Sequence, residues 1–263
     1  MYKIPVLRLA NFLGFIAVVC VNILANALPI NGVTTSEVSA SVPTLVTPAG
    51  FTFSVWILIY LVLLLFAIYQ ILPSQADNDH IERTGWWFVI SSVANIVWLI
   101  LWHHQQFALT VVAMLVLLGS LVIIYLRLGV GTQAVSRRDY FLVNVPFSIY
   151  LAWICVATVV NISAFLTDQG WDGYGISDAQ WAAVMIGLIV ALTLTLLITR
   201  RDIIFAATIV WALVGIWAAR DDTTWLSYVI AAAAILVGAA TVLQLINQLL
   251  WNDSPPPITI AHD

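Results

Sequence analysis

Eight stretches of mostly apolar residues, each 17 to 27 residues long, account for most of this 263-residue sequence. A helix of about 20 apolar residues is long enough to cross the hydrocarbon core of a bilayer. The stretches comprise residues 5–28, 51–72, 86–102, 107–128, 140–166, 181–199, 203–219 and 225–250. We therefore predict an all-α fold, a polytopic membrane helical bundle of about eight transmembrane helices.

The composition supports a membrane protein and argues against a soluble one. Hydrophobic residues make up 62% of the chain, charged residues make up 8%, and the mean hydropathy is +1.03. A water-soluble fold of this length does not need such a balance. The nine basic residues are scattered and the net charge is -4, so the chain has no basic surface for nucleic acid. We expect the lipid bilayer as a partner and no nucleic acid.

The positions of the basic residues predict the orientation in the membrane. Cytoplasmic loops of membrane proteins are enriched in lysine and arginine. With eight spans and a cytoplasmic N-terminus, only Arg220 lies outside. The residues inside are then Lys3, Arg8, Arg83, Arg127, Arg137, Arg138, Arg200 and Arg201. We expect a multi-pass protein of a bacterial inner (cytoplasmic) membrane, with both termini in the cytoplasm and residues 252–263 as a disordered tail.

The first span shares features with a signal peptide, because it follows basic residues and ends in small ones. Its apolar stretch is long for a signal peptide. Asn11, Asn22 and Asn26 also lie close to one face of the predicted helix, as expected for a helix that packs into a bundle. We therefore expect this helix to be retained.

The sequence lacks residues that several functional classes of membrane protein and enzyme require. Lys3 is the only lysine, so no predicted helix can carry a retinal Schiff base. No Asp or Glu lies near the middle of a span, where ion pumps and proton-coupled carriers normally keep one. Motifs such as HExxH, GxSxG and CxxC are also absent. We interpret His103 and His104 as imidazoles in water at the membrane interface, and predict no catalytic residue and no metal site.

Aromatic and amide side chains recur at helical spacing inside three spans. These sets are Trp56 with Tyr60, Asn95 with Trp98, and Trp153 with Ala157 and Asn161. Each set lies on one helix face, and an amide in hydrocarbon needs a partner, so these faces should turn inward. They either hold the helices together or line an aromatic pocket for a flat, apolar ligand. Six other tryptophans fit an interfacial position, namely Trp86, Trp87, Trp102, Trp171, Trp225 and Trp251.

Three segments resemble the tryptophan-rich sensory protein and translocator protein family (TspO/MBR). They are TPAGFTFSVWILIYLVLLLFAIY at residues 47–69, ANIVW at residues 94–98 and RRDYFLVNVPFSIYLAWICVATVVN at residues 137–161. The resemblance covers residues 1–166 and implies the five-helix bundle of that family. Residues 167–251 would then form three additional transmembrane helices outside the five-helix pattern.

The resemblance also implies a binding site and a class of ligand. Carried over by position, it places Trp56, Tyr60, Asn95, Trp98, Trp153, Ala157 and Asn161 in a ligand cavity. Residues 29–50 would act as a lid over its outer mouth. The family binds porphyrins and other flat lipophilic molecules, and transport, sensing and porphyrin breakdown have all been proposed as its activity.

The leading hypothesis is an integral membrane ligand-binding or sensory protein for a tetrapyrrole such as a porphyrin or haem. No covalent cofactor is expected, and a binding role is favoured over an enzymatic one, with porphyrin degradation left open. One alternative is a carrier for a neutral lipophilic solute, which needs a second polar face in the last three helices. Gln244, Asn247 and Gln248 form such a face near the cytoplasmic end. Another alternative is a structural subunit of a larger membrane complex, and a homodimer is also left open.

Overall fold

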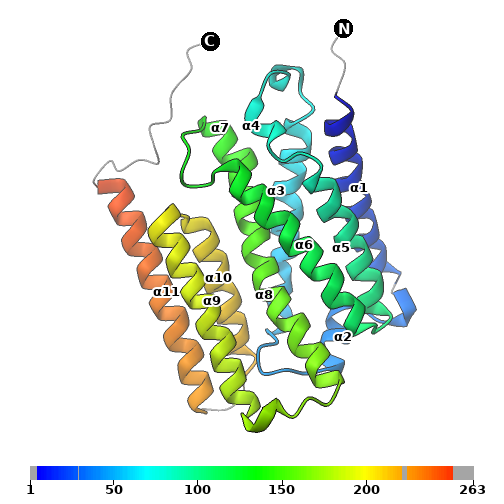
Figure 1. Ribbon diagram of the computed structural model, residues 1–263, viewed down its shortest axis with the longest axis vertical. Helices are drawn as coiled ribbons and strands as arrows, with labels where there is room; N and C mark the ends of the chain where they lie inside the picture. Colours follow the sequence, from blue (N-terminus) through cyan, green and yellow to red (C-terminus); the bar gives the residue numbers. More distant parts are fainter. Residues whose placement is uncertain (1–4, 29, 221–223, 251–263) are drawn as a thin grey trace.

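The structure, a computed structural model, describes residues 5–28, 30–220 and 224–250, and helices are the only regular secondary structure in these ranges (Figure 1). Eight long helices correspond to the eight predicted spans. They are α1 (Val6–Ala27), α3 (Val55–Tyr69), α5 (Trp87–His103), α6 (Phe107–Leu128), α8 (Val145–Asp168), α9 (Asp178–Arg200), α10 (Ile203–Ala218) and α11 (Trp225–Leu250). The predicted tail at residues 252–263 lies outside the described ranges.

The long helices differ in whether length and composition alone qualify them to cross a bilayer. Six segments of 20 to 32 residues do so, among them Gly50–Tyr69 and Arg137–Asp168. The other two, α5 and α10, are apolar helices of 17 and 16 residues. Helices near 17 residues are at the short limit of what spans the hydrocarbon core. The fold is therefore the polytopic helical bundle that the sequence predicts.

The short elements connect these helices. They are the 3-10 turns η1 (Ile30–Gly32), η2 (Gly50–Ser54), η3 (Pro73–Gln75) and η5 (Gly173–Gly175), the short helices α2 (Thr35–Ser41), α4 (Asp79–Glu82) and α7 (Arg137–Asp139), and the π-helical turn η4 (Tyr140–Asn144). Because α7, η4 and α8 follow one another without a break, the fifth span is one long helix with a π-helical turn near its start.

The helices form two groups (Figure 1). Helices α1, α3, α5, α6 and α8 contact one another in one group, and α9, α10 and α11 contact one another in the other. The two groups meet where α8 and η2 pack against α10 and where α8 contacts α9. The predicted division of the sequence into a five-helix bundle and three additional helices stays a prediction.

Seven of the nine basic residues gather at one end of the bundle, here called the basic end, where α1 begins and α11 finishes (Figure 1). Arg220 follows α10 at the opposite end, together with α2. The described asymmetry therefore agrees with the sequence pattern. Arg8 at this end is buried, with 1% of its surface exposed.

Burial of Arg8 is possible because each of its three guanidinium nitrogens has a hydrogen-bond partner. Its Nε atom lies 2.7 Å from Glu82 Oε1, and its other nitrogens donate to backbone carbonyls at the end of α3 and in the turn that follows. A buried charge needs such pairing. Arg8 thus ties α1 to the connection between α3 and α5.

The predicted lid at residues 29–50 contains the short helix α2, which was not predicted from the sequence. Thr34 caps this helix, and Glu37 reaches back to the Thr34 backbone, which completes a capping box. The spacing of a threonine three residues before a glutamate is the sequence signal for such a helix start. Val38 anchors α2 because it is 1% exposed.

Candidate ligand pocket

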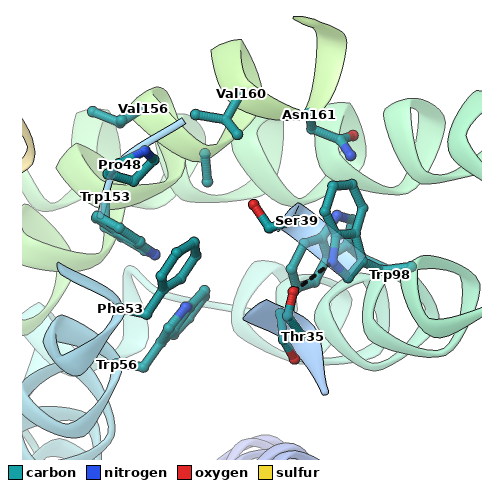
Figure 2. Close-up of a pocket in the computed structure, with 12 residues that line it drawn as sticks. Thr35, Ser39, Pro48, Phe53, Trp56, Trp98, Trp153, Val156, Val160 and Asn161 are labelled. Atoms are coloured by element: carbon teal, nitrogen blue, oxygen red, sulfur yellow. Dashed lines mark hydrogen bonds between the residues drawn. The ribbon is translucent and has the colours of Figure 1, made fainter. Parts of the chain in front are cut away.

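An aromatic pocket lies in the half of the bundle remote from the basic end, under α2 and between α3, α5 and α8 (Figure 2). Its lining comprises Thr35, Ser39, Pro48, Phe53, Trp56, Trp98, Trp102, Trp153, Val156, Ala157, Val160 and Asn161. None of these side chains is charged. The pocket has a cavity volume of about 30 Å³, which is room for one or two water molecules.

The tryptophans of the pocket pack in two clusters. Figure 2 shows Phe53, Trp56 and Trp153 together on one side, with Trp98 toward Asn161 on the other. The Trp153 ring meets Trp56 edge-on at a centroid distance of 6.2 Å and Phe53 at 6.0 Å. Trp98 stacks on Trp102 at 5.7 Å. These are the offset and edge-to-face geometries that aromatic rings prefer.

Three fully buried polar atoms on the lining residues have no hydrogen-bond partner among the residues described. They are the indole Nε1 atoms of Trp98 and Trp153 and the Oδ1 atom of Asn161. The Asn161 amide is held from the other side, because its Nδ2 atom donates to Thr110 Oγ1 on α6 at 2.9 Å. Buried polar groups are normally hydrogen-bonded. Two donors and one acceptor around a single apolar cavity are therefore suited to a ligand with a few polar atoms.

The structure brings five of the seven sequence-predicted residues to this pocket, namely Trp56, Trp98, Trp153, Ala157 and Asn161. Tyr60 and Asn95 are not among the lining residues. Tyr60 lies one turn further along α3 and stacks on Trp56 at 5.5 Å. Asn95 donates to the Tyr150 hydroxyl at 3.1 Å and accepts from Asn22, so its amide joins helices. Asn95 therefore holds helices together, whereas Asn161 lines the pocket.

Several lining residues were not predicted from the sequence. Trp102 was predicted to lie at the membrane interface, but this side chain is 3% exposed and its indole donates to the Thr35 carbonyl of α2 at 3.2 Å. The spacing of four residues from Trp98 was an available signal. Thr35 and Ser39 were missed because α2 was not predicted.

Contacts with α5 hold α2 over the pocket. Besides the bond from Trp102, the His103 Nε2 atom lies 3.5 Å from Thr35 Oγ1, and its Nδ1 atom lies 2.7 Å from the Leu99 carbonyl. His103 is fully buried. The expectation of an imidazole in water is therefore wrong for His103, because α2 covers it, whereas the next residue, His104, is exposed.

The start of α3 is held by α10, a helix of the second group. The Trp211 indole donates to the Thr52 carbonyl at 3.1 Å, and the Ala49 amide donates to the Gly215 carbonyl at 2.9 Å. Phe51 meets Trp211 edge-on at 5.6 Å. Since Phe53 and Trp56 follow directly, α10 helps to position one wall of the pocket.

The pocket offers little to a metal ion. No group of three or more His, Cys, Asp or Glu side chains that could hold a metal occurs within the described ranges. In the polar face of the last span, Gln248 donates to the Arg201 carbonyl and so joins α11 to the end of α9.

Fold and pocket together define a polytopic helical membrane protein with an aromatic-lined intramembrane pocket. The sequence matches the family described as TSPO-like protein over residues 8–246, and the chain belongs to this family. The match includes α9 and α10 and most of α11, as well as the first five long helices. No curated protein and no solved structure matches the chain.

Proposed function

We propose that this protein binds a flat lipophilic ligand of the tetrapyrrole class in the aromatic pocket, as a binding or sensory protein. The observation that carries the proposal is the set of unpartnered polar atoms at Trp98, Trp153 and Asn161 around one apolar cavity. The indole faces would pack on a ring system. The two N–H groups would donate to its acceptor atoms, and the amide oxygen would accept from an N–H group.

Ligand entry requires the pocket to open. Pockets for small molecules usually have volumes of roughly 300 to 1,000 Å³, whereas this cavity has about 30 Å³. In the described state the cavity is therefore too small for such a ligand. The element suited to move is α2, because two polar contacts, from Trp102 and His103, connect Thr35 to α5. Displacement of α2 would remove the Thr35 and Ser39 wall without disturbing the long helices.

The lining favours a metal-free porphyrin over haem. Haem iron in proteins is held by His, Cys, Met or Tyr, and none of these types occurs among the lining residues. We infer that a porphyrin would be bound through ring stacking and hydrogen bonds. Haem, if it enters, should show no spectral sign of axial ligation by the protein.

The test is a titration of the purified protein with protoporphyrin, followed by absorption. We expect a saturable, shifted Soret band. The double substitution Trp98→Phe with Trp153→Phe keeps one aromatic ring at each position but removes both N–H donors. Porphyrin affinity should fall by about tenfold or more, since each net hydrogen bond contributes about 1 kcal/mol.

Trp217→Phe is the matched control, because Trp217 is 50% exposed on α10 and lines none of the described pockets. It should leave the titration unchanged. Equal affinity in the control and the double variant, or a porphyrin signal that does not saturate, would exclude this pocket as the binding site.

A further inference from the structure

A second, larger cavity lies between α8 and α9 and is separate from the aromatic pocket. Its volume is about 430 Å³, within the range of roughly 300 to 1,000 Å³ that is usual for ligand sites. Its lining comprises Pro43, Thr44, Leu45, Val46, Val159, Ile162, Ser163, Leu166, Thr167, Trp171, Asp178, Trp181, Ala182 and Met185. No residue is shared with the aromatic pocket, although both cavities use α8 and the segment that leads to α3.

The lining changes in polarity with depth. Thr167 and Asp178 lie at the ends of α8 and α9, opposite the basic end, whereas Val159 and Met185 lie seven or eight residues further into these helices. At 1.5 Å per residue this places the apolar part about 10 Å below the polar mouth. Such a gradient suits a molecule with a polar head and an apolar body.

Two tryptophans lie at the polar mouth of this cavity. The rings of Trp171 and Trp181 lie 5.1 Å apart, centroid to centroid, and are tilted by 51°. The Trp181 indole is fixed, because its Nε1 atom donates to the Gly173 carbonyl at 3.0 Å. Indole faces attract cations more strongly than other aromatic side chains do.

The charge at the mouth is negative. Asp178 is the single charged residue of the lining, and within the described ranges its carboxylate has no hydrogen bond or ion pair. The connection from Asp168 to Asp178 has no lysine or arginine. One cation borders the cavity wall: Arg220 donates to the Thr44 carbonyl. The lining itself therefore favours a positively charged group.

We propose that this cavity binds an amphiphile with a quaternary ammonium head, which Asp178 and the two indole faces recognise, while the apolar body lies between α8 and α9. This site does not depend on the tetrapyrrole proposal. The same head group could belong to a membrane lipid or to a free amphiphilic cation, so the experiment separates the two.

The test measures equilibrium binding of radiolabelled phenylbutyl-trimethylammonium to the full chain in phosphatidylglycerol nanodiscs. A neutral isostere with carbon in place of the nitrogen gives the contribution of the charge. We expect the cation to bind saturably and at least tenfold more tightly than the isostere. Asp178→Asn and Trp171→Leu should each weaken the cation by about threefold to tenfold, with the thermal unfolding temperature unchanged.

Asp172→Asn is the matched control, since Asp172 is outside the lining and an asparagine can still accept from the Tyr174 amide. Displacement by lysophosphatidylcholine would assign the site to a lipid head group, and resistance to it would assign the site to a free cation. Equal binding of cation and isostere, an equal effect of Asp178→Asn and Asp172→Asn, or displacement of the cation by porphyrin would overturn the proposal.

Discussion

Asn161 and Asn95 are both buried amides in the five-helix group, yet their neighbours give them different roles. The Asn161 amide nitrogen is bonded to Thr110 and its oxygen has no described partner. Asn95 uses both ends of its amide, toward Tyr150 and Asn22. Removing the Asn161 side chain takes away an oxygen that has no described partner, whereas removing the Asn95 side chain leaves the buried Tyr150 hydroxyl without its partner.

We therefore expect opposite losses from two alanine substitutions. Asn161→Ala should lower porphyrin affinity by about tenfold and leave the unfolding temperature nearly unchanged, because Thr110 keeps its own bond to the Phe107 carbonyl. Asn95→Ala should lower the free energy of unfolding by about 1 to 3 kcal/mol, because the Tyr150 hydroxyl loses its partner. Thermal unfolding and porphyrin titration of the same detergent samples distinguish the two roles. If Asn161→Ala unfolds the protein, the Asn161 amide serves only helix packing.

His80, in the connection between α3 and α5, predicts a dependence of stability on pH. Burial lowers the pKa of His80 below its usual value, against the opposing effects of the hydrogen bond to Asn144 and the charge of Asp139. The folded state thus favours the neutral ring. Above the unfolded pKa of about 6.5 the ring is neutral in both states, so the penalty appears only as the pH falls below that value.

We expect the free energy of unfolding to fall between pH 6.5 and the lower folded pKa, by about 1.4 kcal/mol for each unit of pKa depression, and then to level off. The unfolding temperature should follow the same curve. His80→Gln keeps a donor for Asn144 without a titrating ring and should flatten this part of the curve. A curve with the same slope in the variant would assign the pH dependence to other groups. The measurement is thermal unfolding from pH 7.5 to 5.

At the scale of elements, the contact between α10 and η2 connects the two groups of helices. Gly215 allows it, because a Cβ atom at this position would overlap the Thr52 side chain. Thr52 is fully buried, and its backbone carbonyl accepts from Trp211. The absence of a side chain at Gly215 is therefore a packing requirement.

Gly215→Ala should push α10 away from η2 and lower the free energy of unfolding by about 1 to 3 kcal/mol, the usual range for overpacking. Because η2 leads into Trp56, porphyrin affinity should fall as well. Gly187→Ala in α9 is the control, since a Cβ atom there meets nothing within 4 Å; it should be neutral or slightly stabilising. Equal behaviour of the two variants would show that α10 does not support the pocket wall.

At the scale of the whole molecule, an even number of long helices returns the chain to the basic end. The asymmetry of basic residues predicts that this end faces the cytoplasm. Reporter fusions at Gly50 and at the C-terminus should then report opposite sides of the membrane, with the C-terminus inside. Matching sidedness would mean that one helix, α5 or α10 as the shortest, does not cross.

The same scale shows how the three further helices are used. Helix α9 forms one wall of the second cavity, α10 holds the entry to α3, and α11 packs against both. A bundle without these three helices would lack the second cavity and the support for the start of α3. The division at residue 166 stays a prediction, and the family match runs across it.

The eight spans, the uneven basic residues and the aromatic-amide faces were readable from the sequence, because hydropathy and helical spacing are local properties of consecutive residues. The roles of individual side chains were not, because they depend on neighbours 50 or more positions away. Arg8 is buried only because carbonyls after α3 receive it, and Trp102 leaves the interface only because α2 lies over it. Side-chain packing also set the pocket closed at about 30 Å³. Tertiary structure thus decided which inward faces hold helices together and which line the aromatic pocket.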